Sequence, residues 1–159
     1  MNGVPNGFGK TQFTNGDVYE GEHKADERHG FGIFHGAQGG SFKGNYCNGK
    51  REGVGYFIGA SGGYFKGQFK ENSMHGFGRY VFDSGDIYIG QFVNSKFHGK
   101  GKYVFQSGAC FTGNFIDGQT GESDDISDDW FQTELLKATQ LDVPNYEFTL
   151  SFDDARFLD

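Results

Sequence analysis

A stretch in the middle of the chain decides the fold: Phe65-Lys-Gly-Gln-Phe-Lys-Glu-Asn-Ser-Met-His75-Gly-Phe-Gly78. Its order of aromatic, polar and glycine residues returns every 23 residues on both sides. One glycine series falls at 21, 44, 67, 90 and 113, another at 9, 32, 55, 78 and 101, and an aromatic series at 19, 42, 65, 88 and 111. A period of this length is typical of supersecondary units that stack on one another.

Each unit is predicted to be a β-hairpin. Residues 65–70 form a first strand, 71–75 a turn, 76–82 a second strand, and 83–86 the turn into the next unit. Helix is excluded here, because all five leucines lie at position 135 or later and glycine is too frequent. Alternation along the strands places Phe65, Gly67 and Phe69 on one face, so we expect the rings to cover backbone that carries no side chain.

The repeated stretch resembles a MORN (membrane occupation and recognition nexus) repeat. That family's pattern is aromatic-x-Gly-x-aromatic, then x-x-Gly-x-x-His-Gly-x-Gly, over 23 residues. The resemblance covers residues 7–118 and departs most at His23 and Asp26, which replace an aromatic residue and a glycine. It implies an all-β fold: an elongated, curved, single-layer antiparallel sheet of stacked 23-residue β-hairpins. It also implies a scaffold or adaptor in a cytoskeletal, ciliary or membrane-junction assembly.

Composition narrows the function classes. Glycine contributes 28 of 159 residues and aromatic residues 18%, which suits a β-rich chain with many turns. Residues 1–118 carry 12 basic and 10 acidic residues, a net charge of +2. This lacks the basic patch that gives nucleic-acid binding most of its affinity, so we expect no nucleic-acid partner. No signal peptide or long apolar run is apparent, and we expect a cytoplasmic protein, associated with the cytoskeleton or a membrane.

No enzyme, metal or cofactor site is predicted. His29, His75 and His98 share one column, but successive repeats lie ~10 Å apart and ligands of one ion must lie much closer. A structural role in the turn is therefore favoured for these histidines. Cys47 and Cys110 are 63 residues apart, too far along the stack for a disulfide.

The last part of the chain, residues 119–159, has a different composition. It carries 2 basic and 11 acidic residues, a net charge of −9. Ser127 is a candidate N-cap for a helix near 127–141, and alternating apolar residues predict a strand near 146–152. We expect Trp130, Phe131 and Leu135 to dock against residues 88–118 or along the aromatic groove. Three consequences stay open: capping of the array, inhibition of the groove, or a homodimer.

The sequence thus predicts a non-enzymatic scaffold that binds a peptide or helix of a partner protein on its aromatic face. The alternative is a peripheral membrane module that binds anionic phospholipid, using the small basic stripe of Lys43, Lys66 and Lys70. We expect the partner-binding groove to be lined by central aromatic residues of the repeats: Phe42, Tyr46, Phe65, Phe69, Tyr88 and Phe92.

Overall fold

The computed structural model describes residues 6–152 and Phe157, and it shows one open antiparallel sheet with a helix beside it. The eleven strands follow each other in chain order. Their bounds are β1 Asn6–Gln12, β2 Val18–Lys24, β3 Glu27–His35, β4 Ser41–Cys47, β5 Lys50–Ile58, β6 Tyr64–Lys70, β7 Ser73–Val81, β8 Ile87–Val93, β9 Lys96–Val104, β10 Cys110–Ile116 and β11 Gln119–Ser123, followed by α1 Asp128–Ala138. The predicted all-β single-layer architecture with a helical tail is confirmed.

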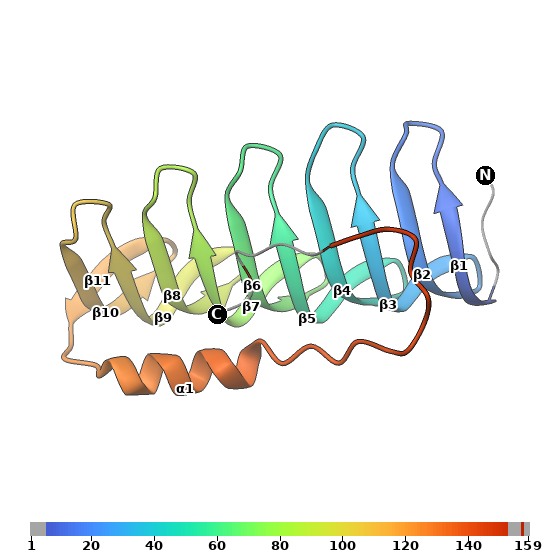
Figure 1. The fold of residues 1–159 in the computed structure, drawn as a ribbon. Coiled ribbons are helices and arrows are strands. Elements are labelled where there is room, and N and C mark those ends of the chain that lie inside the picture. The colour runs from blue at the N-terminus through green and yellow to red at the C-terminus, as the bar shows by residue number, and fades with distance from the viewer. Residues whose placement is uncertain (1–5, 153–156, 158–159) are drawn as a thin grey trace.

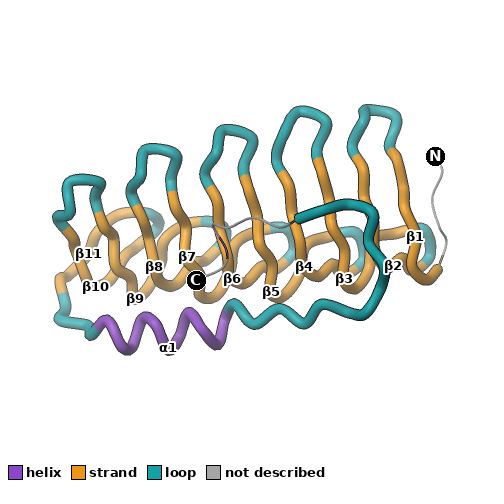
Figure 2. The backbone as a smooth tube through the Cα atoms, viewed as in Figure 1, coloured by secondary structure: helices purple, strands orange, loops and turns teal. Residues whose placement is uncertain are grey.

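The strands stand side by side in one row, and connecting loops lie along both sides of the row (Figures 1 and 2). After β11 the chain turns back. Helix α1 and the segment that follows it in the chain run along the row of strands toward β1 (Figure 1). The sheet continues to Ser123, five residues past the predicted end of the array at 118, because β11 pairs with β10.

The turns inside the repeats are shorter than predicted. Between β6 and β7 only Glu71 and Asn72 turn, with φ of 48° and 72°. Two positive φ values in succession are typical of a tight hairpin turn whose twist matches that of its strands. The second strand therefore begins at Ser73, not at Gly76, and its register shifts where Gly67 and Phe69 pair with it.

Glycines lie opposite one another across the sheet and leave room for the rings. Gly67 pairs with Gly78, and a Cβ on Gly78 would overlap the ring of Phe65. The equivalent rings in the other repeats cover the equivalent glycine pairs, as Tyr19 does over Gly32. The expected packing of rings on glycines is therefore present. It makes the main core of the protein, on one face of the sheet, which we call the aromatic face.

Candidate functional site

The six residues predicted to line a groove lie on the aromatic face, but they form its floor. Each is at most 5% exposed, and they contact one another edge to face. For example, the ring of Phe65 lies 5.3 Å from that of Phe69 and 5.2 Å from that of Phe92. The set is Phe42, Tyr46, Phe65, Phe69, Tyr88 and Phe92. Of these six, Phe42 and Tyr46 line a hollow of this face.

A second layer of rings packs against this floor and is half-buried. It consists of one residue per repeat, in the series Phe34, Phe57, Tyr80 and Tyr103. Each pairs across strands with a floor residue, as Phe57 does with Phe65. Phe105, which lies 4.8 Å from Tyr103, is 47% exposed. These four residues also recur every 23 residues, but a shared period does not distinguish accessible rings from buried ones.

Two arginines lie in the hollow at the β3–β5 end of the aromatic face. The hollow has a volume of about 480 Å³, and Arg28 and Arg51 line it together with Phe34 and Phe57. The Arg28 guanidinium lies 5.0 Å from the Tyr46 ring and donates to the Gly49 carbonyl at 3.1 Å. Sequence reasoning missed this pair, although both residues occupy the same column of successive repeats.

The Arg51 guanidinium is held in the same way as that of Arg28. It lies 5.2 Å from the Phe69 ring and donates to the Asn72 carbonyl at 2.9 Å. Burial lowers the pKa of Arg51 from its ordinary value. Burial also raises the pKa of the Tyr46 hydroxyl to about 12, although the two arginines oppose this shift. The tyrosine is therefore neutral at physiological pH, and the guanidinium groups supply the charge of the hollow.

The opposite face carries the tail. The buried side chains of Phe131 and Leu135 form one cluster with Phe77, and the half-buried Trp130 ring lies 5.7 Å from that of Phe77. The helix contacts β6, β7 and β8. The expected docking along the aromatic groove is therefore wrong. The alternative, docking against residues 88–118, holds in part, because β8 lies within that region. Phe77 and Ile89 point away from the glycines and supply the apolar surface that the helix covers.

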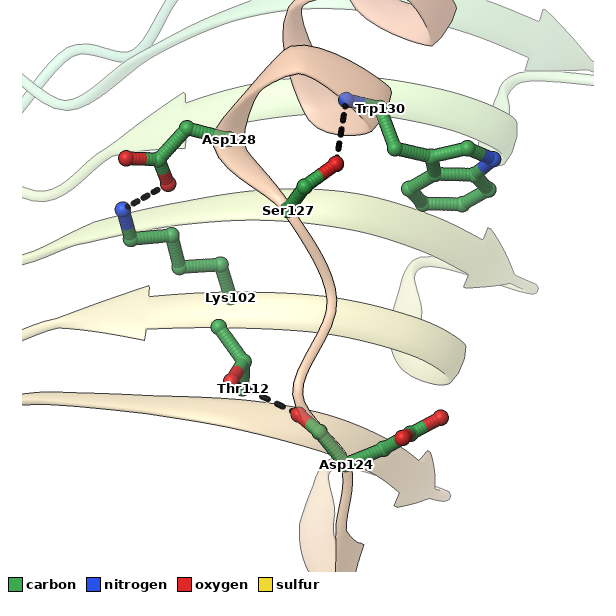
Figure 3. A network of polar contacts seen from close by, with 6 residues as sticks. All are labelled: Lys102, Thr112, Asp124, Ser127, Asp128 and Trp130. Carbon is green, nitrogen blue, oxygen red and sulfur yellow. Dashed lines mark hydrogen bonds and ion pairs between the residues drawn. The ribbon is translucent and has the colours of Figure 1, made fainter.

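Polar contacts fix the start of the helix (Figure 3). Ser127 is the N-cap, and its hydroxyl accepts from the Trp130 backbone N–H at 3.2 Å. Lys102 forms an ion pair of 2.6 Å with Asp128, in the first turn of α1. The Thr112 hydroxyl donates to the Asp124 carbonyl at 2.8 Å. These contacts hold the segment between β11 and α1 against β9 and β10, so the helix begins at a defined place. The helix ends at Ala138, three residues before the predicted end.

The segment after the helix crosses the sheet toward β1 and forms no strand over residues 146–152. Tyr146 stacks on Phe8 with ring centroids 4.4 Å apart. The buried Glu20 carboxylate accepts from the backbone N–H groups of Thr149 at 2.6 Å and Leu150 at 2.8 Å. A side chain of the sheet face takes these backbone donors, so the predicted strand does not form.

The histidine column has a structural role in the hairpins. His29 Nδ1 accepts from the Asn48 N–H, and His98 Nδ1 accepts from the Asp117 N–H, each at 3.3 Å. Glu52, which stands in the same column, accepts from the Glu71 N–H at 2.8 Å. Each side chain thus ties one repeat to the turn of the next. Within the described part of the chain, no cluster of three or more potential metal ligands occurs.

The comparisons with known proteins agree with this geometry. The MORN repeat family matches residues 1–18, 19–41, 42–64, 65–87 and 88–110. No curated protein matches the chain. Over the described residues, no helix has the length and apolar character needed to cross a bilayer. Proteins with these repeats generally take part in protein or membrane interactions and are generally not enzymes. Since the five matches cover residues 1–110 of 159, the chain belongs to the MORN repeat family.

Proposed function

We propose that this protein is a non-enzymatic scaffold that binds a segment of a partner protein on the aromatic face of its array. The observation that carries the proposal is the half-buried layer of rings that packs against a fully buried floor. These rings keep solvent-accessible apolar surface on a face that the described part of the tail leaves open, and such surfaces commonly mark interaction sites. The expected setting is a cytoskeletal, ciliary or membrane-associated assembly in the cytoplasm.

Burial of the six floor residues refines this proposal. Their substitution would change folding together with binding, whereas residues of the second layer are accessible to a ligand. Phe57 and Tyr80 lie in the two central repeats and are half-buried. We therefore assign direct contact with the partner to the second layer, and to Phe42 and Tyr46 where the hollow exposes them.

The experiment is a comparison of partner capture by three full-length proteins. These are the wild type, a Phe57→Ser/Tyr80→Ser variant, and an Ile116→Ser/Leu136→Ser control. Ile116 and Leu136 are 61% and 65% exposed and lie outside the aromatic face core. The three proteins are compared at equal amounts of folded protein. We expect the Phe57→Ser/Tyr80→Ser variant to lose bound proteins that the wild type and the control both retain. Equal retention by all three would contradict the proposal.

The second candidate, binding of anionic phospholipid, is supported by the general association of the family with membranes. The geometry favours it less. Lys66, the centre of the proposed basic stripe, is only 7% exposed and lines a hollow beside the helix residue Leu135. Sedimentation with phosphatidylserine vesicles tests this candidate directly, and we expect no more protein in the pellet than with neutral vesicles.

A further inference from the structure

We propose that Arg28 and Arg51 bind two carboxylate side chains of an acidic partner segment, which continues into apolar residues along the aromatic face. This inference rests on the proposed function, because it assigns the chemistry of the segment that the face binds. The two arginines follow each other at the repeat period. The same column continues with Met74 and Phe97 in the next two repeats. The face is therefore basic toward one end of the array and apolar toward the other.

Both guanidinium groups are already positioned for a ligand. Arg51 lies 5.2 Å from the Phe69 ring and 5.3 Å from the Phe57 ring, and Arg28 lies 5.0 Å from the Tyr46 ring. One hydrogen bond from each side chain goes to a backbone carbonyl. Each guanidinium has five N–H donors in a planar array, so donors remain for a carboxylate. Because ring faces and carbonyls fix the groups, less conformational entropy is lost on binding.

Neither arginine has an acidic partner among the described residues. The ion pairs found there involve His98, Lys102 and Lys137. Burial lowers the pKa of Arg51, because desolvation disfavours its charged form. A charge in such surroundings is unfavourable until an opposite charge arrives, and hydrogen bonds between charged groups are the strong ones. A carboxylate is therefore the group that this hollow lacks.

The charges around the hollow confine the proposed carboxylate site to Arg28 and Arg51. The adjoining hollow, which Arg28 also lines, contains the acidic residues Asp26 and Glu27 as well as Lys50. Ser41 and Asn72 add neutral polar groups to the main hollow. The ligand's acidic groups are thus directed to the space between Arg28 and Arg51, and are repelled from the edge beyond Arg28.

The repeat geometry gives the spacing of the ligand. Two strands advance the array by ~10 Å. A peptide in the polyproline II conformation has three residues per turn and rises ~3.1 Å per residue, so every third side chain lies on the same side, ~9 Å further along. A peptide that lies along the array therefore places one side chain on each repeat every three residues. The expected pattern is two acidic residues three positions apart, followed at the same interval by two apolar residues over the column of Met74 and Phe97.

A phosphate-bearing membrane is the other source of negative charge. The arginines lie in a hollow among half-buried rings, where a flat surface has little access. The last 41 residues, with a net charge of −9, also repel an anionic bilayer. We therefore assign the site to an acidic protein segment.

The test uses the full chain and a labelled ten-residue peptide with glutamate at its first and fourth positions and phenylalanine at its seventh and tenth. The comparison peptide has glutamine in place of glutamate. The variant is Arg28→Met/Arg51→Met, which introduces the residue that position 74 carries in the same column. Lys24→Met/Lys70→Met is the control, because it removes the same charge at two exposed positions. Binding is followed by fluorescence anisotropy at fixed salt, and folding by circular dichroism.

We expect the glutamate peptide to bind the wild type and the control alike. The arginine variant should bind it about tenfold more weakly for each arginine, since a hydrogen bond to a charged group contributes about that much. The glutamine peptide should show the same loss with the wild type. Equal binding by the arginine variant, or no binding of the glutamate peptide to the wild type, would overturn the inference. So would arginine-dependent binding to phosphatidylserine vesicles without binding to the peptide.

The Phe57→Ser/Tyr80→Ser variant separates the two proposals. If it loses the peptide while the arginine variant keeps it, the aromatic face binds segments but the arginine assignment is wrong. If the peptide binds all variants equally, the aromatic face is not the binding surface, and the proposed function fails together with the inference.

Discussion

The two faces of the sheet bury aromatic side chains in different ways. On the aromatic face, Phe65 covers Gly78 of the neighbouring strand, and each repeat brings both the ring and the glycine. On the opposite face, the rings of Phe31 and Phe77 do not cover a glycine in this way. They are covered by Phe148 and Phe131, which come from the tail. The first face is specified by a short period, the second by contacts between distant parts of the chain.

This difference implies different consequences of substitution. A change on the aromatic face acts inside a cooperative row of hairpins, where each unit is stabilised by its neighbours. A change in the tail acts on a segment that docks on an already complete sheet. Substitutions in the array should therefore destabilise the whole molecule, whereas those in the tail should release a part of it.

The largest effect is expected for Gly78→Val. The new side chain would overlap the Phe65 ring, and overpacking of this kind typically costs ~1–3 kcal/mol, with this position at the upper end. The free energy of unfolding in urea measures it. Asn114→Val, on an exposed strand position, is the control and should change stability little. A Gly78→Val melting temperature within about a degree of the wild type would show that the ring does not require the glycine.

Phe131→Ala should have the next largest effect. The side chain is 1% exposed and packs with Phe77 and Leu135, and burial of such a side chain contributes ~1.5–3 kcal/mol. Because the loss falls on docking of α1, we expect backbone amides of the helix to exchange faster while those of β6 and β7 stay protected. Leu136→Ala, at a position 65% exposed, should leave the exchange unchanged. Unchanged protection in Phe131→Ala would contradict docking through this cluster.

The fold of the array could be predicted almost completely from the sequence. The 23-residue spacing of glycine and aromatic residues requires stacked hairpins, and the ring of Phe65 needs the space above Gly78. The exact turns were harder, because the strand that begins at Ser73 includes a register shift that no residue type announces. For the same reason the predicted turn over 71–75 was too long.

The site and the tail were predicted less well. Phe65 and Tyr88 are large and periodic, which suits a binding surface and a core equally, and only packing shows that they are fully buried. Arg28 and Arg51 become candidates only when the structure shows that they lie against aromatic rings and have no acidic partner among the described residues. The alternation of Tyr146, Phe148 and Phe152 predicted a strand, but Glu20 on the sheet face accepts the backbone N–H groups that a strand partner would need.

Glu20→Gln tests that last contact and should have a smaller, local effect. The Glu20 carboxylate is 3% exposed and also accepts from the Thr149 hydroxyl at 2.7 Å. An amide oxygen still accepts the two backbone N–H groups, but these bonds lose their charged acceptor; hydrogen bonds to a charged group contribute ~1.5–3 kcal/mol, against ~0.5–1.5 kcal/mol for neutral ones. We expect amides of residues 146–152 to exchange faster, with α1 unaffected. Glu27→Gln, at an exposed position, is the control, and equal exchange in both variants would show that Glu20 does not hold the segment.

The smallest effect is expected for Ser127→Ala, which removes the N-cap of α1. The Ser127 hydroxyl accepts from the Trp130 N–H at 3.2 Å, and loss of such a cap typically costs ~1 kcal/mol. The helix stays attached, because Phe131 and Leu135 remain buried against Phe77. Hydrogen exchange should therefore accelerate about fivefold over the first turn, at the ~1 kcal/mol level, and leave the array unchanged. Ser61→Ala, in an exposed loop, is the matched control. Complete release of the helix by Ser127→Ala would show that the N-cap determines docking, rather than the apolar contact of Phe131 and Leu135 with Phe77.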